Sequence, residues 1–169
     1  MNYKPAFGSH IPILIKILEQ SDGPVLELGM GIMSTPLLYW MTLDQERKLV
    51  SYDNDEEWVT KHQKFRGRHN EINYVRDWYL APIEDNFWSI ALVDSHPESS
   101  RRELAMRLAE NAHYIILHDS DPKCDFAYKY TDIYDFFNYR YDYTKKSPYT
   151  TVVSNLIDVT KLGEEDDRE

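Results

Sequence analysis

Five short apolar segments alternate with helix-like segments through the first 120 residues, and this alternation limits the available folds more than any other feature. The apolar segments, each of strand length, are 24–29, 48–53, 72–77, 87–95 and 113–120. Because parallel strands must be joined by crossovers, the pattern predicts a Rossmann-like, doubly wound α/β fold with a mostly parallel sheet. Two further β-rich runs, 139–145 and 149–156, have a short connection and predict a C-terminal antiparallel hairpin, which gives seven strands.

Helices are expected between these strands. Ser9 precedes a run of apolar residues at helical spacing with Pro12 in its first turn, so Ser9 is the expected N-cap of the first helix. Ser34 is the expected cap of a helix over 34–43. Two amphipathic helices are expected over 55–65 and 98–112, and a short helix is expected around 131–137.

A single domain is expected over residues 1–160, since 169 residues can enclose one continuous core and no linker interrupts them. Residues 161–169 contain a run of acidic side chains and are expected to be disordered. The net charge of −10 would repel a phosphate backbone, so no nucleic-acid partner is expected. The basic run 61–69 is interpreted as the solvated face of a helix.

We expect no signal peptide, because the first twelve residues lack an apolar segment, and we expect no membrane-spanning segment. Its lone cysteine, Cys124, excludes an internal disulfide and fits a reducing compartment. We therefore expect a cytoplasmic protein without a membrane partner.

Each of the five expected parallel strands leads to a glycine or an acidic residue. The first ends in Gly29 and Gly31, and the following four reach Asp53, Asp77, Asp94 and Asp119. Any one of these acids, taken alone, could be a helix cap. Because the carboxyl ends of parallel strands meet at one edge of a sheet, the four together predict a polar ligand site at that edge.

The segment VLELGMGIMSTPLL, residues 25–38, has the strand–glycine–helix order of a nucleotide-binding turn. A dinucleotide fold would need a third glycine where this chain has Ser34, and the carboxylate of Glu27 would repel a pyrophosphate. The same carboxylate suits a ligand that carries a positive amino group and no phosphate. S-adenosylmethionine has both properties.

The ordered set of motifs over residues 9–157 resembles the class I S-adenosylmethionine-dependent methyltransferases. The segment ELGMG, residues 27–31, is similar to their E/D-x-G-x-G motif. The resemblance implies that Asp53 binds the ribose and that Asp77 and Trp78 hold the adenine. Altogether it implies a cofactor site formed by Glu27, Gly29, Gly31, Ser34, Asp53, Asn54, Asp77, Trp78 and Asp94.

Within this class, the segments ELGMGIMST, VDSHP and IILHDSD are similar to small-molecule O-methyltransferases of the catechol and macrocin type. Several of those enzymes bind a divalent metal, which implies Asp94 and Asp119 as ligands here. The third family position is Ser120, a poor ligand for Mg²⁺, with Asp121 as the alternative. A Mg²⁺ ion and a metal-free site therefore both stay open.

Transfer of a methyl group to a hydroxyl or an amine requires removal of a proton, and histidine is suited to accept it near neutral pH. The expected catalytic residues are His96, His118 and Asp119, at the ends of the fourth and fifth strands. For His118 the alternative is a structural hydrogen bond to the backbone. Arg101 and Arg102 either hold an anionic substrate group or, as the favoured interpretation, lie on a solvated helix face.

The seven tyrosines between residues 128 and 149 are interpreted either as an aromatic wall for the acceptor or as a homodimer contact. The sequence thus predicts an S-adenosylmethionine-dependent methyltransferase that acts on oxygen or nitrogen of a small-molecule acceptor. Two alternatives stay open. One is an enzyme that cleaves the cofactor or transfers its aminopropyl group, and the other is a non-catalytic nucleoside-binding module.

Overall fold

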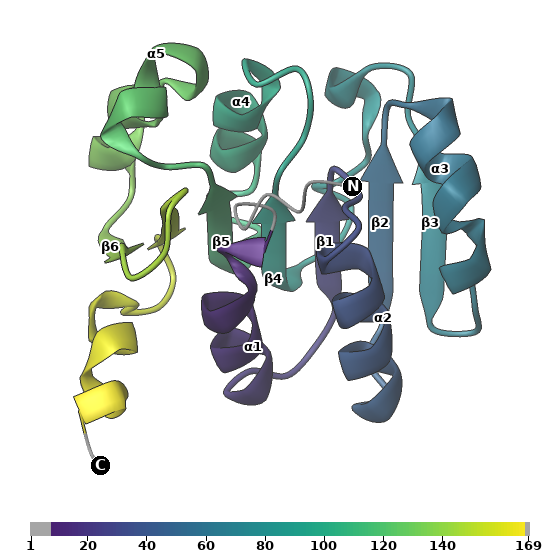
Figure 1. The fold of residues 1–169 in the computed structure, drawn as a ribbon, viewed down its shortest axis with the longest axis horizontal. Coiled ribbons are helices and arrows are strands. Elements are labelled where there is room, and N and C mark those ends of the chain that lie inside the picture. The colour runs from purple at the N-terminus through teal and green to yellow at the C-terminus, as the bar shows by residue number, and fades with distance from the viewer. Residues whose placement is uncertain (1–7, 168–169) are drawn as a thin grey trace.

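The computed structural model describes residues 8–167, which contain one seven-stranded sheet in the order β3-β2-β1-β4-β5-β7-β6 (Figure 1). The strands are β1 (Val25–Leu28), β2 (Leu49–Asp53), β3 (Asn70–Tyr74), β4 (Trp88–Val93), β5 (Ala112–His118), β6 (Tyr139–Tyr143) and β7 (Thr150–Ser154). Strands β1 to β5 are parallel, whereas β7 is antiparallel to both of its neighbours. The expected Rossmann-like sheet with a C-terminal hairpin is confirmed. Its strand order reverses between β1 and β4, where such folds bind ligands.

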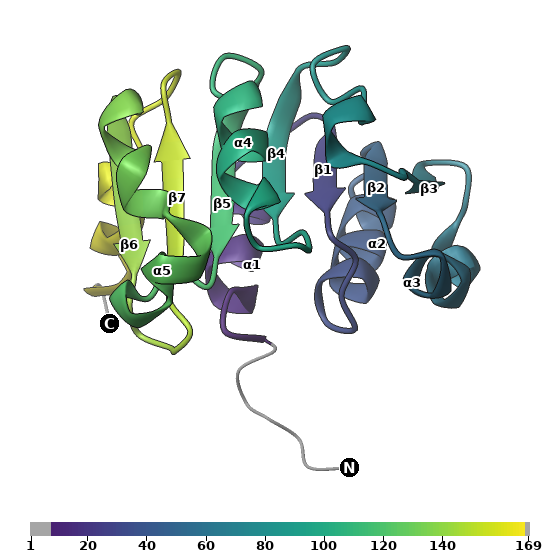
Figure 2. The same cartoon turned by 90° about the horizontal axis from the view of Figure 1, so that it is seen from above.

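Helices cover both faces of this sheet. The α-helices are α1 (Ile11–Glu19), α2 (Ser34–Asp44), α3 (Glu56–His62), α4 (Ser100–Arg107) and the short α5 (Asp125–Tyr128). Figure 1 shows α1 and α2 in front of the sheet, whereas α4 packs into the core on the other face. In Figure 2 the strands follow one another from β6 on the left to β3 on the right.

Apolar side chains along each central strand alternate between two core clusters. In β4, Ile90 and Leu92 pack with α1 and α2, whereas Ala91 and Val93 pack with α4 and residues 130–137. All six residues of β4 are buried. Each fully buried Leu or Ile side chain stabilises the fold by about 1.5–3 kcal/mol. The central strands are therefore held from both faces and form a rigid support for side chains at their ends.

The C-terminal segment packs on the sheet through one apolar residue. Thr160–Asp167 forms a 3-10 helix, η7, and its Leu162 is buried in the same core cluster as Val159. Leu162 thus gives this segment an apolar anchor ahead of the acidic run, and the disorder expected for 161–169 stays a prediction. Residues 168 and 169 lie outside the described part of the chain. The helix expected around 131–137 is present as two 3-10 turns, Tyr130–Asp132 and Tyr134–Phe136.

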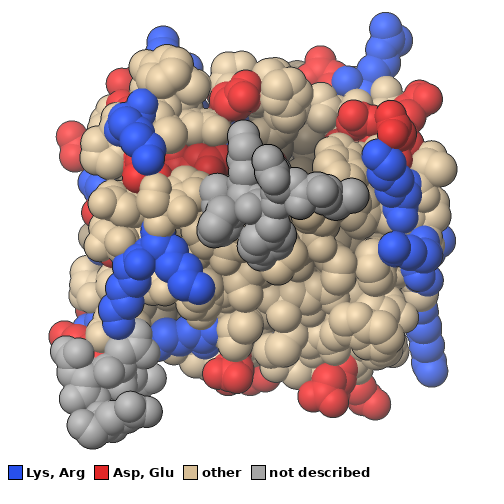
Figure 3. All heavy atoms as spheres, viewed as in Figure 1, with Lys and Arg blue, Asp and Glu red and all other residues tan. Residues whose placement is uncertain are grey.

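Figure 3 shows Lys and Arg side chains along the edge of the molecule that carries α3. Within the basic run 61–69, the side chains of Lys61, Lys64, Arg66 and Arg68 are exposed, as expected for a solvated face. None of the described helices is long and apolar enough to cross a membrane.

Candidate functional site

A glycine turn, residues 29–33, joins β1 to α2 and lies against the end of β4. Gly29 has a φ of +95°, and a Cβ atom there would lie 2.3 Å from the carbonyl oxygen of Asp94. A Cβ atom on Gly31 would lie 2.7 Å from the Oγ atom of Ser34. Gly29 therefore allows the turn to pack on the end of β4, and Gly31 leaves room for the Ser34 hydroxyl.

Glu27 lies beneath this turn and is fully buried, with an exposed fraction of 0%. Its carboxylate accepts hydrogen bonds from the Ser34 hydroxyl at 2.7 Å and from the Thr35 hydroxyl at 2.9 and 3.0 Å. Burial raises the pKa of Glu27 to about 7, although the hydrogen bonds from these hydroxyl groups act in the opposite direction. A charge on Glu27 would thus act on a ligand across the turn and not from a cavity wall.

Two serines that were expected to cap helices contact site residues instead. The N-cap of α2 is the residue before Ser34, and the Ser34 hydroxyl donates to Glu27. The helix α1 begins without a side-chain cap, and Ser9 Oγ is hydrogen-bonded to Nε2 of His118 at 3.0 Å. Both corrections have the same physical reason. A buried polar partner outside the helix competes with the free amides at the helix end for the hydroxyl group.

Asp53, the last residue of β2, ties the glycine turn to the sheet. Its Oδ2 atom accepts the amide of Met30 at 2.7 Å, and its Oδ1 atom accepts the amide of Asp55 at 2.9 Å. Burial raises the pKa of Asp53, and these hydrogen bonds oppose the increase. Removal of this carboxylate would therefore loosen the turn as well as any contact with a ligand.

A cavity of about 460 Å³ opens beside the ends of β2 and β3 and the start of α4, and Asn54, Asp77 and Trp78 line it. Three of the predicted cofactor residues thus lie together. Asp77 also caps the following 3-10 turn by accepting the amide of Tyr79 at 3.0 Å. Trp78 is buried, and its indole N–H donates to the carbonyl oxygen of His96 at 2.7 Å. This bond fixes the ring at the cavity wall.

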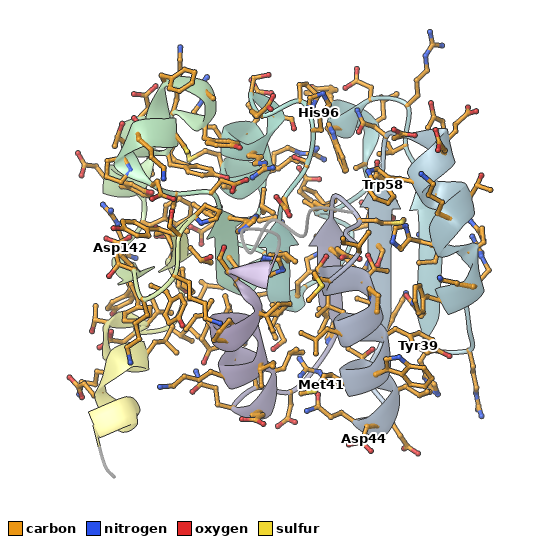
Figure 4. The ribbon with its side chains drawn as sticks, in the orientation of Figure 1. Tyr39, Met41, Asp44, Trp58, His96 and Asp142 are labelled. Atoms are coloured by element: carbon orange, nitrogen blue, oxygen red, sulfur yellow. The ribbon has the colours of Figure 1, made fainter. Side chains whose placement is uncertain are left out.

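A second cavity, of about 230 Å³, lies between the glycine turn and the ends of β4 and β5. It is lined by apolar and polar residues: Met30, Gly31, Ile32, Met33, Ser34, Trp58, His10, Asp94 and His118. Three of the predicted cofactor residues, Gly31, Ser34 and Asp94, therefore face this cavity. Figure 4 shows Trp58 at the carboxyl-terminal edge of the sheet. Both cavities thus open at the carboxyl-terminal edge of the sheet, beside different strand ends.

His10 was not identified from the sequence. Its exposed fraction is 2%, and neither ring nitrogen has a hydrogen-bond partner among the described residues. The ring meets that of His118 edge-on, with the centroids 4.5 Å apart. Burial, together with the charge of His118, lowers the pKa of His10 to about 4, so the imidazole is neutral at pH 7. A neutral imidazole in a cavity can accept a hydrogen bond or a proton from a ligand.

Arg101 of α4 joins Asp94 and Asp119, which follow β4 and β5. Its Nη2 atom lies 2.8 Å from Oδ1 of Asp94, and its Nη1 atom lies 3.0 Å from Oδ2 of Asp119. Nδ1 of His118 donates to Oδ1 of Asp94 at 3.2 Å and lies 3.6 Å from Oδ2 of Asp119. Three predicted site residues, Asp94, His118 and Asp119, therefore form one cluster with Arg101.

Opposite charges in this cluster stabilise the charged forms of one another. Burial alone would raise the pKa of Asp94, but the hydrogen bond and charge of His118 lower it below its usual value. Burial acts to lower the pKa values of His118 and Arg101, but Asp94 raises both. Asp94 thus stabilises the charged form of the His118 imidazole, and the hydrogen bond between them holds both side chains in place.

Arg101 corrects the expectation of a solvated helix face. Its exposed fraction is 6%, whereas Arg102 forms a surface ion pair with Asp132 at 3.2 Å. The sequence contained a signal for this difference. Position 101 shares a face of α4 with the buried Leu104 and Ala105, so it should have been assigned to the core side.

Two of the late tyrosines support the same cluster. The hydroxyl of Tyr128 donates to Asp119 at 3.1 Å, and Cζ of Arg101 lies 4.6 Å from the centre of the Tyr128 ring. Tyr130 is buried, stacks on Tyr128 and donates to the carbonyl oxygen of His118 at 3.0 Å. These two side chains brace the strand ends.

The structure does not bring His96 to this cluster. The side chain of His96 is 78% exposed, and its Nδ1 atom lies 3.6 Å from a carboxylate oxygen of Glu98. Figure 4 shows His96 at the outer edge of the molecule.

The residues expected as the third metal ligand also point elsewhere. The Thr151 hydroxyl donates to Ser120 Oγ at 2.9 Å, and Asp121 accepts the amide of Tyr149 at 2.6 Å, so both residues secure the hairpin. Potential ligand atoms of Asp94, His118 and Asp119 lie within 4.8 Å of one another, but Arg101 bridges the two carboxylates.

No family model matches the sequence, and no curated protein matches it. Solved methyltransferase structures do share its fold. The N-terminal domain of human METTL16 in complex with SAH (S-adenosylhomocysteine) has a TM-score of 0.63 and 11% identity over 93% of this chain and 73% of that chain. The O-methyltransferase from Bacillus cereus in complex with SAH has a TM-score of 0.62 and 12% identity, over 90% and 82%.

The N-methyltransferase NodS from Bradyrhizobium japonicum WM9 has a TM-score of 0.57 and 9% identity, over 85% and 91% of the two chains. At these identities the likeness establishes the fold. The chain therefore has the Rossmann-like fold of the class I S-adenosylmethionine-dependent methyltransferases.

Proposed function

We propose that this protein is an S-adenosylmethionine-dependent methyltransferase that transfers a methyl group to an oxygen or nitrogen atom of a small-molecule acceptor. The observation that carries this proposal is the glycine turn at the reversal of strand order, with one cavity towards β2 and β3 and a second towards β4 and β5. A transfer between two molecules needs adjoining binding places. The bound SAH in two structural neighbours supports the choice of cofactor.

The larger cavity suits the nucleoside end of the cofactor. Asn54, Asp77 and Trp78 line it, and Asp53 lies where β2 meets the glycine turn. The carboxylate of Asp77 can accept a hydrogen bond from the exocyclic amine of adenine. The buried Glu27, whose pKa is raised, would be stabilised in its charged form by a positive ammonium group near the turn.

The smaller cavity, which the glycine turn also lines, suits the acceptor beside the amino-acid end of the cofactor. Its volume of about 230 Å³ and its apolar wall favour a small, partly apolar molecule. When bound, S-adenosylmethionine supplies an electrophilic methyl group. The neutral His10 is suited to take the proton of an acceptor hydroxyl or amine, and His118, held by Asp94 and Asp119, is suited to orient the acceptor.

Calorimetric titration with S-adenosylhomocysteine tests the cofactor assignment. The wild type should bind with micromolar affinity, and Asp53→Asn should bind at least about tenfold more weakly, which corresponds to ~1.4 kcal/mol. Asp44→Asn is the matched control, because Asp44 is an exposed acid that Figure 4 shows at the opposite edge of the sheet. Its affinity should equal that of the wild type. No heat from either S-adenosylmethionine or its demethylated product, in a folded sample, would contradict the proposal.

Incubation with S-adenosylmethionine carrying a radiolabelled methyl group tests the reaction. Labelled product from an extract of small metabolites would support methyl transfer. Cleavage products formed without an acceptor would point to an enzyme that breaks the cofactor. Binding without any product would point to a nucleoside-binding module.

A further inference from the structure

We propose that Arg101 is a built-in cation that occupies the place a divalent metal ion would need between Asp94 and Asp119, so that this site works without a metal. The statement that Arg101 occupies the position of a metal ion rests on geometry alone. The part that concerns catalysis rests on the methyltransferase function proposed above.

The ligand atoms of Asp94, His118 and Asp119 have a spacing that one ion could bridge. They lie within 4.8 Å of one another, and divalent ions bind oxygen at about 2.0–2.6 Å. The guanidinium group already spans this gap, because its two terminal nitrogens lie 2.8 Å from Asp94 and 3.0 Å from Asp119. A metal ion and the guanidinium group cannot both lie between the two carboxylates.

Arg101 is also fixed from other directions. Its Nε atom donates to the carbonyl oxygen of Ser95 at 2.7 Å, and Nη1 donates to the carbonyl oxygen of His118 at 3.2 Å. The ring of Tyr128 lies 4.6 Å from Cζ. A metal ion would therefore have to displace a buried guanidinium group and leave two backbone carbonyl groups without this donor.

The donor set is poor for Mg²⁺ in another respect. Mg²⁺ prefers oxygen ligands. Asp121, the remaining acid close in sequence, accepts a hydrogen bond from the amide of Tyr149 and so does not serve as a ligand at this site. The charge of Arg101 replaces that of a metal without any dependence on metal supply. As a positioning residue, Arg101 holds Asp94, which in turn holds His118.

Titration with Mn²⁺, followed by the electron paramagnetic resonance signal of the free ion, tests this inference on the full chain. The wild type should bind no Mn²⁺ at this site, and Mn²⁺ or a chelator should leave its melting temperature unchanged. Arg101→Ala should gain one Mn²⁺ site at least about tenfold tighter than any in the wild type. The double variant Arg101→Ala/Asp119→Asn should lose that site, and the neighbouring control Arg102→Ala should not gain one.

Two results would overturn the inference. One is a Mn²⁺ site in the wild type that Asp119→Asn removes. The other is a folded Arg101→Ala protein that binds no more Mn²⁺ than the wild type. If Arg101→Ala does not fold, Arg101→Gln keeps most of the side-chain volume without the charge and takes its place in the same titration.

Binding of S-adenosylhomocysteine to the same wild-type sample separates this inference from the proposed function. Failure of that binding, with the Mn²⁺ results as expected, removes the methyltransferase proposal and leaves the built-in cation. A wild-type Mn²⁺ site together with intact S-adenosylhomocysteine binding removes the built-in cation and leaves the methyltransferase proposal.

Discussion

The carboxyl-terminal edge of the sheet has two halves, the ends of β1 and β2 and the ends of β4 and β5, and the carboxylates of the two halves have different partners. On the β1–β2 half, Glu27 and Asp53 are buried and accept hydrogen bonds from hydroxyl and backbone amide groups. Within residues 8–167, neither forms an ion pair. On the β4–β5 half, Asp94 and Asp119 share Arg101. Burial raises the pKa values of Glu27 and Asp53, whereas the pKa of Asp94 is lowered by His118 in spite of burial.

A cationic ligand would therefore stabilise the β1–β2 half, whose carboxylates have no cation. The β4–β5 half already has its charges balanced. A buried carboxylate without a cation costs free energy, and a positive group placed nearby recovers part of that cost. The β4–β5 half has its own cation, so it contributes fixed geometry. A cationic cofactor therefore fits the first half, and a neutral acceptor fits beside the second.

The largest expected effect comes from removing the cation of the balanced half. Arg101→Met should lower the free energy of unfolding by about 3 kcal/mol, because two partly buried carboxylates lose their shared partner. Arg102→Met removes only a surface ion pair and should cost less than about 1 kcal/mol. Urea denaturation measures both variants. Equal losses would mean that Arg101 holds no special position and that the two halves do not differ in this way.

Glu27, in the β1–β2 half, should make the free energy of unfolding depend on pH. The pKa of Glu27 is raised from 4.5 to about 7 in the folded state, so its contribution to stability is complete below pH 4.5 and is lost as the pH rises to 7. Glu27→Gln removes this loss. Relative to the wild type, its free energy of unfolding should therefore rise by up to about 3 kcal/mol between about pH 4 and about pH 8, measured by denaturant unfolding.

Asp94→Asn is the control in the other half and should give the opposite trend. The pKa of Asp94 is lowered from 3.8, so the stability that Asp94 contributes is present above this value and is lost as the pH falls through the folded-state pKa. The deficit of Asp94→Asn should shrink towards acid pH, whereas the advantage of Glu27→Gln should appear towards neutral pH. Parallel trends for the two variants would contradict the comparison.

Much of this edge could be predicted from the sequence because it depends on local periodicity. The apolar strand runs, Gly29, Gly31 and the acids at strand ends are features of single segments, and a parallel sheet brings them to one edge. Even the burial of Glu27 follows from the period of two along β1. Glu27 shares a face with Val25, which packs with α1 and α2.

The partners of these residues could not be predicted in the same way, since they come from distant elements. Ser9 and His118 are 109 positions apart, so no local pattern joins them. His10 reaches the smaller cavity because it immediately precedes α1, which packs in front of the sheet (Figure 1). Arg101 is a different case. Its spacing from Leu104 indicated the buried face, although a buried charge is rare unless it is paired.

The smallest expected effect concerns His10, which lies between the two halves. His10→Leu should raise the free energy of unfolding by about 1 kcal/mol, because it removes two buried ring nitrogens that have no partner among the described residues. Thermal unfolding followed by circular dichroism measures the change. S-adenosylhomocysteine binding should persist, since His10 lines the smaller cavity, and any methyl transfer should be lost.

His96→Leu is the matched control, because His96 has an exposed side chain at the outer edge. It should change the free energy of unfolding by less than about 0.5 kcal/mol and leave methyl transfer intact. A gain in stability for His10→Leu alone would place His10 among residues kept for a ligand at the expense of the fold. A lower melting temperature would show that the imidazole has a partner in solution. His10 would then belong to the balanced network of His118 and Asp94, and the acceptor would have to lose its proton to another group.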